Sequence, residues 1–100
     1  MAVKVLIKRY FKEESVSDAM RLINDFRKNA MNQSGYISGE TWVNHYDPRK
    51  ITVLSTWQTV EDWIRWQESD QRDTNEARLR HLQAQPATFE IYDLGTTAKG

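Results

Sequence analysis

Residues 36–57, YISGETWVNHYDPRKITVLSTW, contain two runs of β-branched and aromatic residues on either side of a turn. The runs cover residues 36–45 and 51–57, and each is predicted to be a strand. Between them, Asp47 and Pro48 favour a chain reversal, because proline fixes a backbone angle and the aspartate side chain bonds back to the chain. The segment is therefore predicted to form a β-hairpin.

A strand and a helix precede this hairpin. Residues 2–10 alternate β-branched with other side chains, which predicts a strand. Ser15 and Asp18 have the spacing of a capping box and predict the start of a helix. The apolar side chains that follow recur at helical spacing and form one stripe: Ala19, Leu22, Ile23, Phe26 and Ala30. Gly35 comes shortly after this pattern and suits a chain reversal.

A second helical region and a last strand follow the hairpin. Thr59 and Asp62 again have capping-box spacing, and helical periodicity continues to residue 67. Residues 69–75 are polar and are predicted to break the helix, which resumes over residues 76–83 and ends before Pro86. Residues 88–94 are predicted to be the last strand, closed by Gly95. The order β-α-β-β-α-β predicts an α+β fold of the split βαβ type, with residues 1–100 as one domain.

Composition excludes several classes of protein. The chain has 100 residues and no cysteine, so disulfides, thiolate metal sites and a cysteine nucleophile are ruled out. Fourteen Lys plus Arg balance fourteen Asp plus Glu, and this neutrality argues against a nucleic-acid partner. The N-terminal apolar run is short and interrupted by charge, so we expect no membrane segment and a cytoplasmic protein.

The strands carry large apolar side chains on both faces. Whichever alternate set faces the helices, the opposite face keeps either Leu6 and Tyr10 or Val5 and Ile7. Two-sided apolar character suggests burial on both faces, and two helices cover only one. We therefore expect a homodimer, which the zero net charge does not oppose.

Candidate site residues are mostly aromatic. No nucleophile elbow and no glycine-rich phosphate loop is present. His45 with Asp47 is too small a set for a metal site, so no metal is predicted. A site for a flat organic molecule is an apolar concavity with sparse polar groups, and the residues that suit one are Trp42, Asn44, His45, Tyr46, Trp57, Trp63, Trp66 and His81. The plainer interpretation keeps Trp57 and Trp63 in the core and both histidines on the surface. Residues 71–75 look like a solvated loop, from which Arg72 could reach an anionic ligand.

Four short motifs resemble the antibiotic biosynthesis monooxygenase family: Gly35-Tyr36 at the second strand, STWQT at 55–59, VEDW at 60–63 and FEIYDLG at 89–95. The resemblance implies a ferredoxin-like subunit with an antiparallel four-stranded sheet, paired as a dimeric α/β barrel. It also implies a ligand cavity between sheet and helices, and oxygenases that act on quinol-like aromatics without metal or flavin.

The resemblance extends to a haem-degrading branch of the family. That branch uses an Asn on the first strand, a Trp on the second helical segment and a His further along. Trp63 matches the Trp, but Lys8 or Arg9 stands at the Asn position and Asp73 near the His position. Haem degradation is therefore disfavoured.

The first functional hypothesis is a monooxygenase of a small aromatic or quinol, with no cofactor. Trp63 and Trp66 would wall the pocket, and His45, Tyr46 or His81 would handle the proton. The second hypothesis is a non-catalytic dimeric module that binds a small hydrophobic molecule or has a structural role. The third is a haem-binding protein. Sequence alone leaves open whether the chain is an enzyme.

Overall fold

The computed structural model describes residues 1–94. Its elements follow the predicted order, with one short 3₁₀ turn before the first helix and with the two helical segments of the second half closer together than predicted. In chain order they are β1 (Val3–Tyr10), η1 (Glu13–Ser15), α1 (Val16–Met31), β2 (Tyr36–Val43), β3 (Lys50–Trp57), α2 (Val60–Gln67), α3 (Asp70–Arg80) and β4 (Thr88–Asp93).

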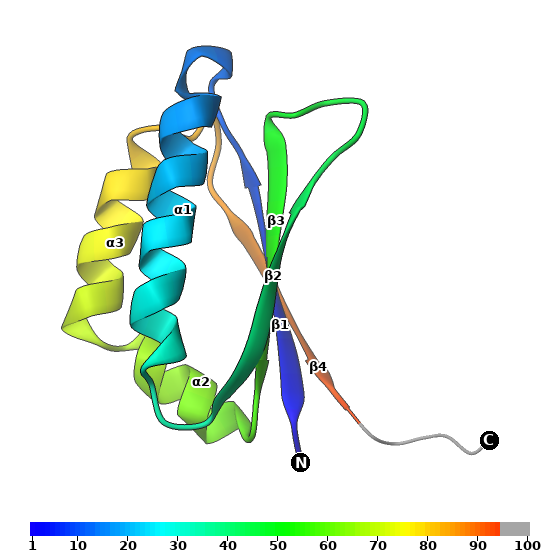
Figure 1. Ribbon diagram of the computed structural model, residues 1–100, viewed down its shortest axis with the longest axis vertical. Helices are drawn as coiled ribbons and strands as arrows, with labels where there is room; N and C mark the ends of the chain where they lie inside the picture. The colour runs from blue at the N-terminus through cyan, green and yellow to red at the C-terminus, as the bar shows by residue number, and fades with distance from the viewer. Residues whose placement is uncertain (95–100) are drawn as a thin grey trace.

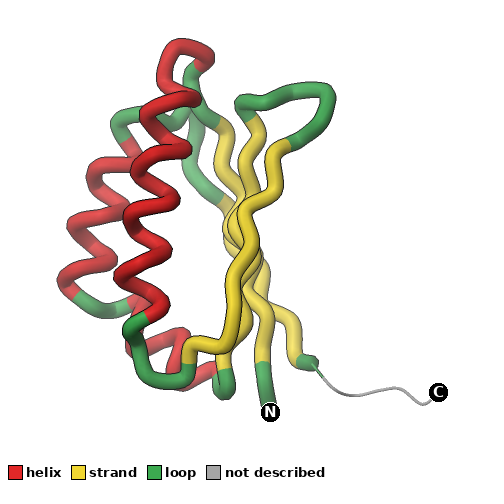
Figure 2. Tube along the Cα trace, in the orientation of Figure 1, coloured by secondary structure: helices red, strands yellow, loops and turns green. Residues whose placement is uncertain are grey.

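The four strands form one sheet in the order β2-β3-β1-β4 (Figure 1). Every neighbouring pair is antiparallel, and β1 and β3 occupy the centre. The helices all lie on one side of this sheet (Figure 2). This arrangement is the predicted ferredoxin-like α+β fold.

The register settles which face of β1 the helices cover. Val3, Val5 and Ile7 are buried and pack in one cluster with Trp57 and Trp63. Because successive side chains of a strand point to opposite faces, the even-numbered residues of β1 lie on the other face. A second cluster, at the other end of the helical layer, contains Phe11, Ala19, Ile23, Ile51 and Leu79.

The uncovered face of the sheet is mixed rather than uniformly apolar. Leu6 lies opposite Leu54 on this face. Polar side chains lie between the apolar ones: Lys4 Nζ donates to Thr56 Oγ1 at 3.0 Å, and Lys8 Nζ lies 3.4 Å from a carboxylate oxygen of Glu90. The prediction of apolar residues on both faces is thus met only in part.

The capping predictions had different outcomes. Thr59 Oγ1 accepts from the backbone N–H of Asp62 at 3.1 Å, as predicted. The prediction for Ser15 is wrong, since its side chain accepts no such bond from any described residue. Its backbone, at φ −105° and ψ −1°, lies outside the extended region that N-cap residues adopt, because η1 runs directly into α1.

The predicted break over residues 69–75 is also wrong. The interruption between the helices is confined to two residues, and α3 begins at Asp70 with Ser69 as its cap. The buried residues of α3 are Arg72, Asn75 and Leu79, two of which are polar. A helix that buries polar side chains gives no apolar stripe, which is why periodicity missed its first turns. The helix also ends at Arg80 rather than at residue 83.

Gly35 makes the turn between α1 and β2, as predicted. Its φ of +85° lies in the left-handed region that favours glycine. A Cβ atom there would approach Asp62 Oδ2, at the start of α2. Glycine thus lets this turn contact the cap of the second helix.

Among residues 1–94, no helix combines the length and apolarity needed to cross a membrane.

Candidate functional site

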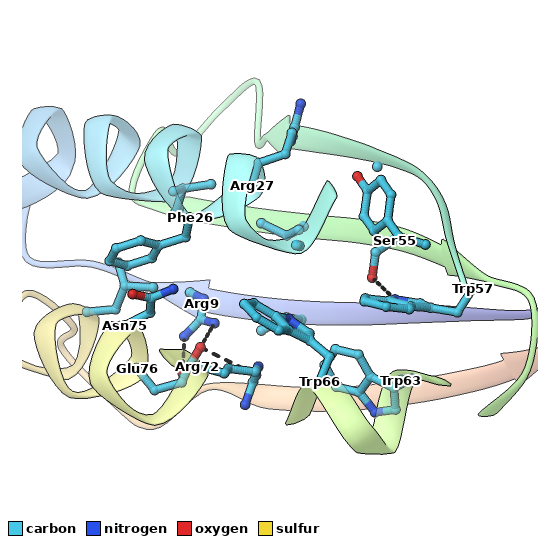
Figure 3. Close-up of a pocket in the computed structure, with 17 residues that line it drawn as sticks. Arg9, Phe26, Arg27, Ser55, Trp57, Trp63, Trp66, Arg72, Asn75 and Glu76 are labelled. Carbon is cyan, nitrogen blue, oxygen red and sulfur yellow. Dashed lines mark hydrogen bonds and ion pairs between the residues drawn. The ribbon is translucent and has the colours of Figure 1, made fainter. Parts of the chain in front are cut away.

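A cavity lies between the helical layer and the sheet, at the level where α1, α2 and α3 face β1 and β3 (Figure 3). Its volume is about 80 Å³. Sites for drug-sized ligands occupy roughly 300–1,000 Å³, so this cavity suits only a compact molecule. The aromatic and apolar lining residues are Ile7, Ile23, Phe26, Ala30, Tyr36, Val53, Trp57, Trp63, Trp66 and Leu79, and the remaining ones are Arg9, Arg27, Gly39, Ser55, Arg72, Asn75 and Glu76.

Aromatic rings form one end of the cavity. Trp57 meets Tyr36 edge to face at 5.3 Å between centroids and Trp63 at 5.9 Å. The Trp57 indole N–H donates to Ser55 Oγ at 3.0 Å, which fixes that ring. Such edge-to-face pairs are favourable beyond the area they bury, so this end of the cavity is rigid.

Tyr36 brings a phenol into the lining. Gly39, three residues further along and past a β-bulge, leaves room for it, because a Cβ at position 39 would collide with the Tyr36 hydroxyl. Burial raises the pKa of Tyr36 above its usual 10.0, and the nearby charge of Arg27 offsets part of that rise. The phenol is therefore protonated at neutral pH and is available as a hydrogen-bond donor.

A buried ion cluster forms the opposite end. Arg9 binds Glu76 in a two-pronged pair, with Nη1 2.9 Å from Oε1 and Nη2 2.6 Å from Oε2. Arg9 Nη1 also donates to Gln83 Oε1 at 2.9 Å. Arg72 Nη2 lies 3.3 Å from Glu76 Oε2, at ion-pair distance but without the alignment of a hydrogen bond. Figure 3 shows Arg9 reaching from β1 toward Arg72 and Glu76 on α3.

The pKa directions follow from this geometry. Burial by itself would raise the pKa of Glu76, but the hydrogen bonds from Arg9 and the charges of Arg9 and Arg72 outweigh it, so the pKa is lowered. Burial lowers the pKa of Arg72, against the attraction of Glu76. Glu76 is thus ionised at neutral pH and holds both guanidinium groups at the cavity.

Three of the sequence-predicted site residues meet in the cavity, namely Trp57, Trp63 and Trp66. All three are also buried, so these residues belong to the core and line the cavity at the same time. The cavity is small enough that its walls belong to the core.

Trp42 and Asn44 lie elsewhere, in a shallow groove of about 470 Å³ at one end of the uncovered sheet face, with Lys8, Tyr10 and Lys50. The groove is larger than the cavity and Arg9 lines both, but Trp42 is the one tryptophan among the residues that line the groove, and Glu76 and Arg72 are not among them. We therefore place the candidate site in the cavity.

The three residues predicted to handle a proton do not line the cavity. His45 and Tyr46 lie in the connection after β2, which ends at Val43 rather than at residue 45, and Tyr46 is 92% exposed. His81 is the exposed C-cap of α3. Their role in catalysis stays a prediction that this geometry does not support.

Sequence reasoning placed Arg72 within reach of an anionic ligand but on a loop, and it gave Arg9, Tyr36 and Glu76 no role in the site. Arg9 carried part of a signal, because its position in the alternation puts it on the same face as Val3, Val5 and Ile7, although periodicity did not say which face is buried. No signal in the sequence indicated that Glu76 would be buried, since an acidic residue on a polar helix is ordinarily solvated. Within residues 1–94 no three His, Cys, Asp or Glu side chains are grouped to hold a metal ion.

Comparison with known proteins gives a consistent result. The family model described as antibiotic biosynthesis monooxygenase matches residues 2–85. No protein with a curated description matches. Among solved structures, a conserved protein from Methanosarcina mazei Go1 is 21% identical, with 92% of this chain and 91% of that chain covered and a TM-score of 0.86.

Two further solved structures share the fold. Rv0793 from Mycobacterium tuberculosis is 11% identical, with 99% of this chain and 100% of that chain covered and a TM-score of 0.86. SnoaB from Streptomyces nogalater, described as a cofactor-independent oxygenase, is 9% identical, with 96% of this chain and 95% of that chain covered and a TM-score of 0.86. At these identities the likeness is one of fold alone.

Proposed function

The chain belongs to the antibiotic biosynthesis monooxygenase family, and from this membership we propose that it is a cofactor-independent monooxygenase of a small aromatic or quinol-type substrate. One observation carries the proposal: three tryptophans, a protonated phenol and three guanidinium groups, those of Arg9, Arg27 and Arg72, line one compact cavity. Tryptophan walls suit a flat ring, and buried donors suit the negative charge that such a ring acquires when it loses a proton.

The chemistry needs only the substrate and O₂. A hydroquinone that has lost one proton transfers an electron to O₂, and the resulting ring radical and superoxide join at a ring carbon as a hydroperoxide. Loss of water from that carbon leaves a hydroxyquinone. One oxygen atom of O₂ stays on the ring and the other leaves as water, and the four electrons that this reduction needs come from the ring.

The residues of the cavity have distinct parts in this proposal. The indole rings of Trp57, Trp63 and Trp66 hold the substrate ring and exclude water. The positive charges of Arg9 and Arg72 favour the ionised substrate over the neutral one. The Tyr36 hydroxyl, protonated at neutral pH, can donate to a substrate oxygen.

The test follows both atoms of ¹⁸O₂ with hydroquinone in buffer that contains a chelator. Enzymatic turnover places one labelled oxygen in the hydroxyquinone and forms no H₂O₂, whereas spontaneous oxidation by O₂ gives unlabelled quinone and H₂O₂. Unlabelled product at the rate of the protein-free blank would overturn the proposal.

A pair of tryptophan variants locates the reaction. Trp66→Phe should lower kcat/KM about tenfold, because the ring loses part of its wall and its alignment. Trp42→Phe is the matched control and should change kcat/KM less than twofold, because Trp42 lies 47% exposed on the uncovered sheet face. The opposite ranking would move the site to the groove. His81→Ala should leave the rate unchanged.

A non-catalytic module that binds a small molecule is the second candidate. Two observations favour this candidate: the cavity is small, and Glu76 is engaged in an ion pair with Arg9. If the protein binds a ligand but no ¹⁸O from O₂ enters the hydroxyquinone, the result favours this candidate. Haem stays disfavoured, since Lys8 or Arg9 stands at the Asn position, Asp73 lies near the His position, and the cavity is about 80 Å³.

We also propose that two copies pair through the uncovered sheet face, in the cytoplasm. Figure 2 shows no helix over that face of the described chain, and Trp42 and Tyr92 are exposed there. Light scattering after size-exclusion chromatography should give about twice 11.8 kDa. A mass of one chain at micromolar concentration would contradict the dimer.

A further inference from the structure

Four buried N–H donors at the cavity have no acceptor among residues 1–94. They are Arg9 Nε, Trp63 Nε1, Asn75 Nδ2 and Arg72 Nη2, the last of which has an ion-pair contact with Glu76 but no aligned hydrogen bond. All four residues line the cavity and are 2–7% exposed. Buried polar groups nearly always have a partner, and leaving one without any costs roughly 1–3 kcal/mol. Four at one site indicate that the site is built to receive acceptors.

The side chains that carry these donors are neighbours, and Glu76 joins two of them. Arg9 Nη2 and Arg72 Nη2 contact the same oxygen of Glu76. The Arg72 guanidinium also lies over the Trp63 ring, 5.1 Å from its centroid. Asn75 is three residues after Arg72 on α3 and so shares its face of the helix. A single small group can therefore meet several of these donors.

The charges of the cluster select the sign of that group. Arg9 and Arg72 contribute two positive charges, and Glu76 contributes one negative charge. One positive charge is left over within this cluster, in which the Arg9 and Arg72 side chains are only 4% and 9% exposed. A carboxylate carries one negative charge and has about four lone-pair sites, which matches both the excess charge and the number of donors.

We infer that the natural ligand of the cavity is a single aromatic ring that carries a carboxylate, held by Arg72, Asn75, Trp63 and the Nε of Arg9. The inference rests on the proposed function for the place of the ligand, and it adds a charge that the ligand has before any reaction begins. The carboxylate binds at the end formed by α3 and β1, and the ring lies against the tryptophans.

The test compares benzoate with benzamide, which have the same ring and nearly the same size but differ in charge. Binding is followed on ¹⁵N-labelled protein through the four tryptophan indole N–H signals, of which Trp63→Phe identifies one. We expect benzoate to bind about tenfold more tightly than benzamide, since hydrogen bonds to a charged group are the stronger kind. The Trp63 indole signal should move with benzoate.

Arg72→Gln should remove the preference for benzoate, and Asn75→Ala should weaken benzoate binding about fivefold without a change of charge. Arg21→Gln is the charge-matched control: its side chain is 67% exposed on α1, and the preference should survive. Thermal unfolding of each variant establishes that it is folded. If Arg72→Gln does not fold, Asn75→Ala still tests the inference.

Equal binding of the two probes, or no binding of either, would overturn the inference and indicate that water satisfies the four donors. These outcomes are separate from the oxygenase test. Selective benzoate binding without turnover of any hydroquinone would refute only the proposed function. Turnover of hydroquinone without a preference for benzoate would refute only the carboxylate.

Discussion

Replacing Glu76 by Gln keeps the size of the side chain and one acceptor oxygen but removes the charge that both Arg9 and Arg72 contact. Breaking a buried ion pair by removing one partner costs about 3–5 kcal/mol, because the other charge stays buried without compensation. Since Gln can still accept from Arg9, the lower figure of about 3 kcal/mol is the appropriate one. A free energy of unfolding of about 5–15 kcal/mol is usual, so the loss is a large part of the total.

The assay is urea unfolding followed by circular dichroism at neutral pH, with thermal unfolding beside it. In a domain of this size each 1 kcal/mol shifts Tm by about 4–8 °C, so the variant should melt about 12–24 °C lower. Glu68→Gln is the control, because Glu68 is exposed and the net charge changes equally. Its free energy of unfolding should stay within about 0.5 kcal/mol of the unsubstituted protein.

The pH dependence gives the same prediction a second readout. The folded-state pKa of Glu76 lies below its usual 4.5, so its contribution to stability is present above that pH. That contribution is lost as the pH falls through the folded-state pKa, where the carboxylate takes up a proton. The difference between Glu76→Gln and the unsubstituted protein should therefore be largest near neutral pH and shrink in acid. A loss below about 1 kcal/mol, or one that does not change with pH, would refute the reasoning.

Three shorter predictions concern stability and use the same unfolding measurements. Thr59→Ala should cost about 1 kcal/mol, because it removes the cap of α2, whereas Ser15→Ala should cost less than about 0.5 kcal/mol; equal losses would contradict the assignment of caps. Gly39→Ala should cost about 1–3 kcal/mol and shift the near-ultraviolet signal of Tyr36, whose hydroxyl occupies the space of the new Cβ; an unchanged signal would argue against that packing. Phe11→Ala should cost about 3–5 kcal/mol, because the ring is 0% exposed; a loss under 2 kcal/mol would mean that the site collapses around the cavity.

The local pattern of the sequence determined most of the elements. The apolar stripe of α1 packs as predicted, with Ala19 and Ile23 fully buried, and Gly35 makes the turn that its backbone freedom allows. Thr59 caps α2 at the predicted position. These features depend on residues within a few positions of one another, so spacing alone reveals them.

The composition of the site was decided by the tertiary structure. Periodicity left both faces of β1 open, and only the packing of the helices against the sheet put Arg9 on the buried side, where it pairs with Glu76 of α3. Arg9 is 67 residues from Glu76, and neither residue has a local reason to be buried. Arg72 and Asn75 belong to a helix whose polar side chains face inward, so the apolar pattern could not place them.

The sequence by itself thus determined the order of strands and helices, because that order depends on short-range periodicity, turns and caps, and four short motifs gave the resemblance to the family. Only the tertiary structure decided that the cavity ends in arginines and an asparagine rather than in His45 or His81. The physical reason is that a polar side chain becomes buried when a distant partner offsets the cost of removing it from water, and that partner is not written in its neighbourhood.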